Sequence, residues 1–182
     1  MANWYEDQLS NRNFLSPIGF LFILDKARKV SFLCQKAEIP TVDLGQVEIP
    51  TRGMVPIPVE GNMRYSEFSM EFIVDEDLRN YMQIHNWMRA LGTPQEFKER
   101  RVWLNKYADS PSEDPRFSDA TLQVLNNNNI ANFDVVFKDM FPVSLSSLPF
   151  DVTGGDNDYF TATTTFRYTL YEIRNTNSQT RR

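Results

Sequence analysis

The stretch RYSEFSMEFIV, residues 64–74, decides the fold class of this chain. Phe68, Met70, Phe72 and Val74 are each separated by a single, mostly polar residue. Because successive side chains of a β-strand point to opposite faces, this period of two indicates a strand with one buried and one solvated face. The stretch therefore predicts a protein built on β-sheet.

Four further segments favour strands. Residues 19–25 and 29–36 are apolar runs on either side of a basic turn at 26–28, and we expect them to form a hairpin. Residues 133–138 alternate like the first stretch. Residues 160–170 place threonines opposite an apolar face, which is typical of a half-exposed strand because threonine is β-branched. Strands outnumber helices, so the expected fold is mainly β (α+β).

One main α-helix is expected at about residues 76–91. Acidic residues 75–77 are expected to cap its start, while Gly92 and Pro94 end it. A weaker helical pattern covers about 94–108 and is expected to bury Phe97, Trp103 and Leu104. Apolar side chains recur every three or four residues along the main helix: Leu78, Tyr81, Ile84, Met88 and Leu91. The expected architecture is a β-sandwich or barrel flanked by this helix.

A proline-rich stretch, residues 38–61, predicts a protruding hairpin. Proline cannot donate to a central ladder, so we place two edge strands at about 43–60 around a turn at 51–53. An isolated hairpin is marginally stable in water, so this one requires a partner surface, in its own core or on another subunit. Its two arms are apolar, with Val47, Ile49, Val55, Ile57 and Val59.

The composition argues against most catalytic chemistry. The chain has 182 residues, of which 41% are hydrophobic, which fits one packed domain. Cys34 is the single cysteine, so an intramolecular disulfide is excluded. With 19 basic and 24 acidic side chains, the net charge of −5 has the wrong sign for general binding to nucleic-acid phosphates. The longest apolar run, residues 18–24, is too short to cross a membrane, and the N-terminus lacks a secretory pattern, so we expect a soluble cytoplasmic chain.

No catalytic or metal-binding constellation is predicted. His85, the single histidine, is interpreted as a packed or surface residue of the helix; a small enzyme centred on it is one alternative. Cys34 is interpreted as a small buried hydrophobe. Asp156 and Asp158 resemble calcium ligands, but the EF-hand pattern is missing and a hairpin loop is preferred. We expect no cofactor and no metal.

A basic-aromatic cluster at residues 98–107 is the second alternative site. Mixed cations and aromatic rings are typical of nucleic-acid readers, which bind phosphates and stack bases. Glu96 and Glu99 dilute the positive charge, and an amphipathic helix explains the pattern as well. The cluster consists of Lys98, Arg100, Arg101, Trp103, Lys106 and Tyr107.

The order of these elements resembles the tail-tube protein of contractile-tailed bacteriophages. The features that carry the resemblance span nearly the whole chain: FLCQKAEIP (32–40), VEIPTRGMVPIPVEG (47–61), YSEFSMEFIVDED (65–77), LRNYMQIHNWM (78–88), PQEFKERRVWLNKYAD (94–109), KDMFPVSLSSLPFD (138–151), read as an aromatic-proline connection, and the closing strand TATTTFRYTLYEI (161–173). The loop at 111–116 and the tail after Ile173 have no place in this pattern, which leaves room for a related protein at a tube end.

The resemblance implies a structural subunit without catalysis. Such subunits form hexameric rings that stack into a hollow tube, inside a tail sheath and between baseplate and tail-terminator proteins. DNA passes through the tube without specific binding, and no membrane is involved. The implied location is the virion tail, after assembly in the host cytoplasm. Alternatives are a baseplate initiator or terminator with the tube fold, and a nucleic-acid-binding module using residues 98–107; tubes of type VI secretion share the fold.

The expected organisation is an N-terminal arm at 1–18, a β domain at 19–174 and a flexible tail at 175–182. The net acidic charge suits a conduit, because a wall that attracted phosphates would hold DNA rather than let it slide. Contacts between rings or subunits are expected from the hairpin, at Val47, Ile49, Met54, Val55 and Ile57.

Overall fold

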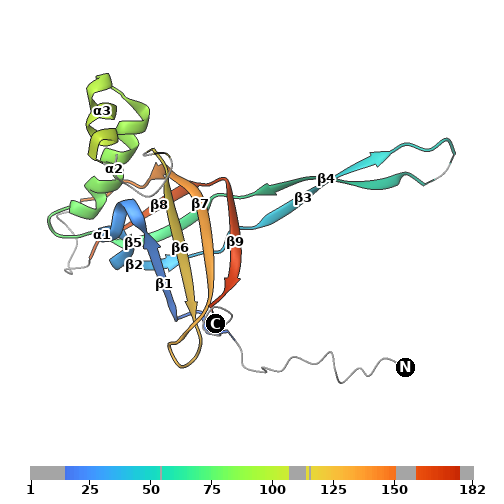
Figure 1. Ribbon diagram of the computed structural model, residues 1–182, viewed down its shortest axis with the longest axis horizontal. Coiled ribbons are helices and arrows are strands. Elements are labelled where there is room, and N and C mark those ends of the chain that lie inside the picture. Colours follow the sequence, from blue (N-terminus) through green and yellow to red (C-terminus); the bar gives the residue numbers. More distant parts are fainter. Residues whose placement is uncertain (1–14, 54, 107–113, 115, 151–158, 177–182) are drawn as a thin grey trace.

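A computed structural model describes residues 15–53, 55–106, 114, 116–150 and 159–176 (Figure 1). The strands are β1 (Phe20–Leu24), β2 (Cys34–Ala37), β3 (Val42–Ile49), β4 (Ile57–Tyr65), β5 (Phe68–Ile73), β6 (Ser118–Leu125), β7 (Ala131–Leu145), β8 (Thr161–Arg167) and β9 (Leu170–Asn175). The helices are the 3₁₀ turn η1 (Asp25–Ala27), α1 (Arg28–Phe32), α2 (Arg79–Gly92) and α3 (Phe97–Lys106). The mainly β fold with a flanking helix and a protruding hairpin is confirmed. Most of the expected arm at 1–18 and tail at 175–182 lies outside the described residues.

The long strand β7 organises the body of the molecule. Its first half pairs with β6 on one side and with β9 on the other, and its second half pairs with β8. β5 and then β2 continue the sheet from β8, β1 flanks β6, and every pairing is antiparallel. Asp139, with a φ of 55°, lies between the two halves of β7. This left-handed residue marks the point where the strand passes from one part of the sheet to the other.

The segments expected as one closing strand and as a connection are arranged differently. Residues 160–170 are not a single strand, because β8 ends at Arg167 and β9 begins at Leu170. Each pairs with a different half of β7, so the chain changes neighbours at this break. The segment expected as an aromatic-proline connection lies largely inside β7. Pro142 fits there because the register with β8 shifts between Pro142 and Ser144, where a missing N–H is tolerated.

Four phenylalanine rings fill the core between the strands. Phe68 of β5 stacks on Phe22 of β1 with ring centroids 5.1 Å apart and lies 4.8 Å from Phe137 of β7. Phe166 of β8 lies 6.4 Å from Phe68. All four side chains are buried. The alternation that predicted the β5 strand is confirmed, because its residues alternate between buried and half-buried positions.

Residues 29–36 do not form the second arm of a hairpin, contrary to the sequence prediction. The chain turns through η1 and α1, β1 pairs with β6, and β2 pairs with β5. Ala27 and Val30 are both fully buried, at a spacing that suits a helix, and the Ser31 hydroxyl accepts a hydrogen bond from the Leu24 N–H at 2.8 Å. Burial and this local bond override the β propensity of the apolar run, which is a weak preference.

The main helix lies where expected, but its caps differ from the prediction. No acidic residue lies in the first turn of α2 and no side chain caps Leu78, which has a left-handed φ of 57°. Asn80 replaces the expected acidic cap, because its buried amide oxygen accepts from the Asp75 and Tyr81 N–H groups. At the other end Gly92 is still helical, and Thr93 is the left-handed residue that ends the helix.

The weaker helix is also present, as α3, with one wrong assignment. Trp103 is buried, as expected, and its ring stacks on Trp87 of α2 at 6.0 Å. Phe97 is 86% exposed rather than buried. No helix in the described part of the chain is long and apolar enough to cross a membrane.

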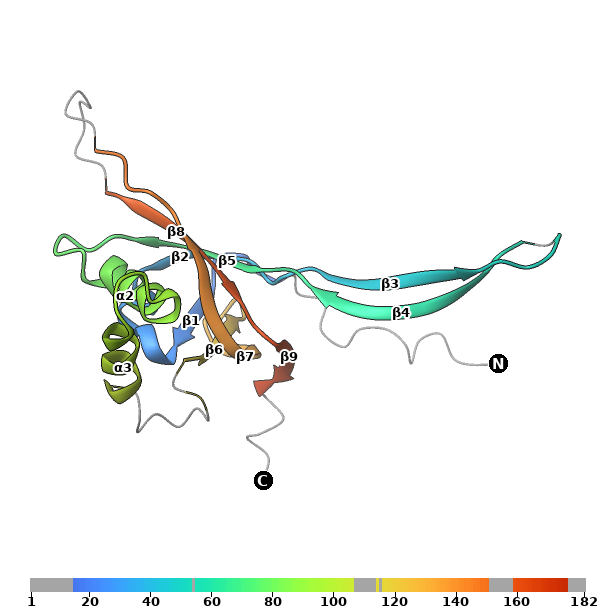
Figure 2. The same cartoon turned by 90° about the horizontal axis from the view of Figure 1, so that it is seen from above.

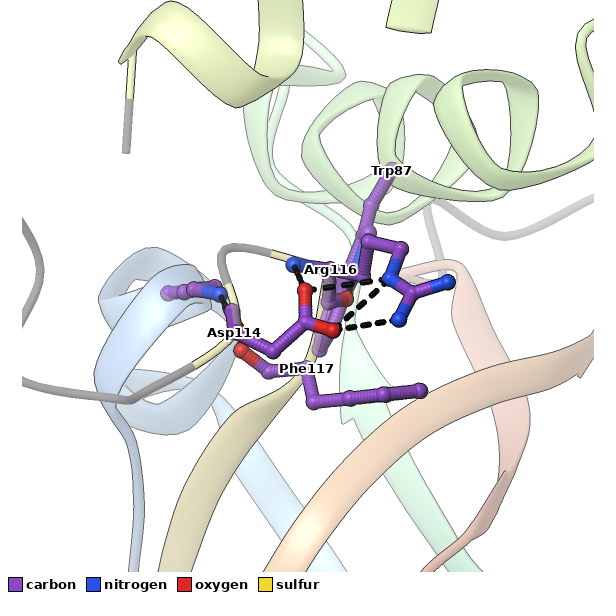
Figure 3. Close-up of polar contacts among 5 residues, drawn as sticks. Trp87, Asp114, Arg116 and Phe117 are labelled. Atoms are coloured by element: carbon purple, nitrogen blue, oxygen red, sulfur yellow. Dashed lines mark hydrogen bonds and ion pairs between the residues drawn. The ribbon is translucent and has the colours of Figure 1, made fainter. Parts of the chain in front are cut away.

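A polar network attaches the helices to the start of β6 (Figure 3). The Trp87 indole N–H donates to the Arg116 carbonyl at 2.9 Å, and the buried Lys26 ammonium donates to the carbonyls of Asp114 and Phe117. The Arg116 guanidinium binds the Asp114 carboxylate at 2.8 Å and holds the pKa of that carboxyl below its usual value. Burial lowers the pKa of Lys26. These bonds fix α2 against the sheet.

Candidate assembly interface

The β3–β4 hairpin extends far from the body of the molecule (Figure 2). Its root is anchored by short polar contacts, since the Thr41 N–H and the Tyr168 hydroxyl donate to the Ser66 hydroxyl and carbonyl at 2.9 and 2.8 Å. The ring of Tyr65 also lies 5.4 Å from that of Tyr171. Burial, with Tyr171 and Tyr65 nearby, raises the pKa of Tyr168 to about 12. The root is therefore well attached although the hairpin beyond it is solvated.

The outer half of the hairpin has one apolar face. Val47 lies opposite Val59 and Ile49 opposite Ile57 in the antiparallel register. Val47, Ile49 and Ile57 are 59%, 49% and 56% exposed. Polar residues occupy the reverse face, where Gln46 pairs with Glu60. The ribbon is amphipathic, and its apolar side is left exposed by the described part of the chain.

The apolar face changes sides at a pair of glycines. Gly45 lies where the β3–β4 register shifts, and a Cβ added at Gly61 would approach the Gly45 carbonyl oxygen to 2.9 Å. Between this irregularity and the body of the molecule, Leu44 lies opposite Met63. Both side chains are on the same face of the ribbon as Gln46, which lies on the other side of the irregularity, toward the tip. The inner and outer halves of the hairpin therefore present apolar side chains on opposite faces of the ribbon.

Four of the five residues predicted to make subunit contacts can be placed. Val47, Ile49 and Ile57 share the outer apolar face, and Val55 lies nearer the tip with 85% exposure. Met54 lies outside the described residues. Their role in assembly stays a prediction.

The inner apolar residues were missed. Leu44 and Met63 are 60% and 55% exposed, and Val42 pairs with Tyr65 on the same face. The alternation of Val42 with Leu44, and of Met63 with Tyr65, was a usable signal.

The sheet also has edges that could accept a neighbour. Among the described strands, β1, β2 and β9 each pair with one other strand. Leu21 and Ile23 of β1 are 47% and 39% exposed. Unpaired strand edges with apolar residues are regions where another chain can add to a sheet.

The residues considered for catalysis or metal binding are not brought together. His85 is exposed on α2. Cys34 is half-buried, its thiol donates to the Lys36 carbonyl at 3.6 Å, and burial raises the pKa of the thiol to about 11. No group of three His, Cys, Asp or Glu side chains in the described ranges could hold a metal ion. Asp156 and Asp158 lie outside those ranges.

Part of the basic cluster predicted at 98–107 lines a groove between α2 and α3, but Arg100 and Arg101 are not among the lining residues. The groove has a volume of about 790 Å³, and Lys98, Val102 and Lys106 line it from α3. Trp103 is buried against Trp87, so its ring is not available for stacking with a base. Tyr107 lies outside the described residues.

Comparisons with known proteins agree with the fold. A family model described as phage tail tube protein matches residues 8–174. No curated protein matches the sequence. Among solved structures, the tube-terminating cap of the anti-feeding prophage shares 13% identity and a TM-score of 0.61, covering 96% of this chain and 99% of that chain.

Two further solved structures have the same fold. The sheath–tube complex of an extracellular contractile injection system (PVC) gives 13% identity and a TM-score of 0.60, covering 90% of this chain and 93% of that one. A chain of the anti-feeding prophage baseplate gives 12% identity and a TM-score of 0.55, covering 85% of this chain and 89% of that one. The family match extends from the N-terminal region to the last strand, and so the chain belongs to the phage tail tube protein family.

Proposed function

We propose that the chain is the repeating subunit of a tail tube, forming hexameric rings that stack into a hollow conduit, with no catalytic activity. The observation that carries this proposal is the hairpin, whose outer face exposes Val47, Ile49 and Ile57. Burying such apolar area contributes about 25 cal/mol per Å², so a face that the described residues leave exposed favours assembly. A tail sheath outside the tube and a baseplate and terminator at its ends complete the proposal.

The face of β5 and β8 that points away from the core is proposed as the wall of the conduit for DNA. It is rich in hydroxyl groups, with Thr163 and Thr165 on β8. Cations here and on the adjoining strand β2 are paired with carboxylates, Arg167 of β8 with Glu67 at 2.9 Å and Lys36 of β2 with Glu38 at 3.0 Å. Because carboxylates balance these cations, the wall has no net positive charge from them that would retain phosphates.

The proposal is tested by two adjacent substitutions on opposite faces of β3. Val47→Asp places a charge on the apolar face and is expected to leave soluble, folded protein that no longer forms tubes, because burying an unpaired carboxylate is costly. Gln46→Asp adds the same charge to the polar face and is expected to form tubes like the unchanged protein. Negative-stain microscopy and sedimentation velocity measure assembly, and circular dichroism checks the fold. Normal tubes from Val47→Asp would contradict the hairpin assignment.

A tube-end protein is the second candidate, because the prophage cap aligns with 96% of this chain at a TM-score of 0.61. A repeating subunit is expected to form tubes of indefinite length when purified alone. An end protein would stop at single or paired rings, and it would shorten tubes made by another subunit. Length distributions in micrographs separate the two.

A further inference from the structure

The groove between α2 and α3 runs along both helices. Its lining residues recur every three or four positions, so each helix contributes one continuous face. This is the geometry that accepts a third helix along a seam. The lining residues are Arg79, Met82, Gln83, Asn86, Arg89 and Ala90 on α2 and Lys98, Glu99, Val102, Trp103 and Lys106 on α3.

The floor of the groove is apolar and firmly supported. Met82 and Val102 are 45% and 69% exposed, and Ala90 and Trp103, which also line the groove, are buried. Trp103 stacks on Trp87 with an interplanar angle of 12°. A partner would therefore meet a preformed apolar strip rather than one that must be ordered on binding.

The rim of the groove is positive although the chain is acidic. Four Lys or Arg and one Glu line the groove, whereas the whole chain has a net charge of −5. Arg79 and Lys98 pair with Asp77 and Glu96 at 2.8 and 3.5 Å, and both pairs are largely exposed. Exposed pairs contribute little, so incoming carboxylates can replace these partners.

The groove also lies away from the proposed stacking surface. In both views α2 and α3 are at the end of the molecule opposite the hairpin tip (Figures 1 and 2). A protein bound there does not cover the outer hairpin face of the same subunit.

We propose that this groove binds an acidic amphipathic helix of a different protein in the same assembly. The apolar stripe of that helix would cover Met82 and Val102, and its carboxylates would meet Arg79, Lys98 and Lys106. A nucleic acid fits less well, since the floor is apolar and the Trp103 ring is covered. The inference rests on the proposed function only in placing the partner within a tube assembly.

The test uses a fluorescein-labelled helical peptide with leucines along one face and glutamates flanking them. Fluorescence anisotropy is measured on Val47→Asp protein, so that binding is scored without tube formation. We expect salt-sensitive binding that weakens by about tenfold or more in Lys98→Glu/Lys106→Glu and in Val102→Asp. Lys36→Glu/Arg167→Glu, an equal charge change on β2 and β8, is the matched control and is expected to bind normally.

Four outcomes would overturn the inference. The first is that the glutamate peptide does not bind at low salt, and the second is that a lysine-substituted version binds equally well. The third is that a 20-nucleotide single strand binds more tightly than the peptide. The fourth is that the peptide binds more tightly after Asp109→Asn/Glu113→Gln, which would indicate that the chain's own acidic segment occupies the groove. Groove variants with an intact hairpin are expected to form tubes. If the unchanged protein failed to form tubes, the proposed function would be contradicted, but the result of the peptide experiment would still hold.

Discussion

At the scale of single residues, a few buried polar side chains decide the local structure. Lys26 is 3% exposed and holds two backbone carbonyls, and the buried Asn80 satisfies N–H groups at the start of α2. A buried polar group is tolerated only when it is hydrogen-bonded, so these residues fix the path of the chain around them. Neither role is visible in the sequence, where Lys26 is interpreted as part of a short basic turn.

Cys34 gives a prediction about pH. Because burial raises the pKa of its thiol to about 11, the reactive thiolate is scarce near neutral pH in the folded protein. Alkylation by iodoacetamide should be slow at pH 8, accelerate as the pH rises toward 11, and become fast at pH 8 once urea unfolds the chain. Mass spectrometry follows this directly, since the chain has one cysteine. A folded-state rate at pH 8 equal to the urea rate would contradict the burial.

The same pKa has a stability consequence with a definite sign. The folded state favours the neutral thiol, so its contribution to stability is present below the unfolded pKa of about 9 and is lost as the pH rises toward 11. Cys34→Ala should therefore lose less stability than the unchanged protein over this interval, as measured by urea titrations at each pH.

At the scale of elements, the periodicity of the sequence predicted those helices and strands whose local preference tertiary contacts did not override. The β5 strand and the α2 helix could be predicted because each has a sustained pattern of period 2 or 3.6, and the protruding hairpin could be predicted because prolines mark its two strands as edge strands. The α1 helix could not be predicted, because it depends on the pairing of β1 with β6, whose residues lie more than ninety positions away in the sequence. The break between β8 and β9 could not be predicted either, because it depends on their pairing with different halves of β7. The outer half of the candidate interface was predicted from prolines and apolar residues in the sequence, whereas its inner half needed the strand register and the helix groove needed the packing of α2 on α3.

The glycine pair in the hairpin predicts a difference between two similar substitutions. Alanine at Gly61 would bring its Cβ to 2.9 Å from a backbone oxygen, whereas alanine at Gly45 meets its nearest atom at 3.3 Å. Backbone must move in the first case, so Gly61→Ala is expected to disturb the hairpin at a cost of about 1–3 kcal/mol, and Gly45→Ala less. Protease cleavage within residues 42–65 and tube formation report the change. Equal behaviour of the two variants would contradict the close approach.

At the scale of the whole molecule, the fold separates three surfaces. The hairpin leaves the body in one direction, the helices cover the opposite end, and the hydroxyl-rich face of β5 and β8 lies away from the core (Figures 1 and 2). A subunit that is enclosed by copies and partners on several sides needs such a separation, because each contact must form without blocking the others.

The proposed conduit wall predicts a difference in access between small and large reagents. In a Cys34→Ser background, Thr163→Cys in assembled tubes should react with biotin-maleimide yet remain inaccessible to streptavidin, because the biotin would lie inside the tube. His85→Cys on the exposed side of α2 should bind streptavidin after the same treatment. Gel shifts of tubes and of unassembled protein provide the comparison. Streptavidin binding to intact tubes through position 163 would place that face outside.

The length of the hairpin has a mechanical consequence. A strand of eight residues such as β3 spans about 27 Å at about 3.4 Å per residue, so a 5° tilt at its base moves the far end by about 2 Å. The hairpin is thus a lever arm whose pivot is the tyrosine cluster of Tyr65, Tyr168 and Tyr171. The stiffness of that pivot would set how far a filament of these subunits can bend before its joints open.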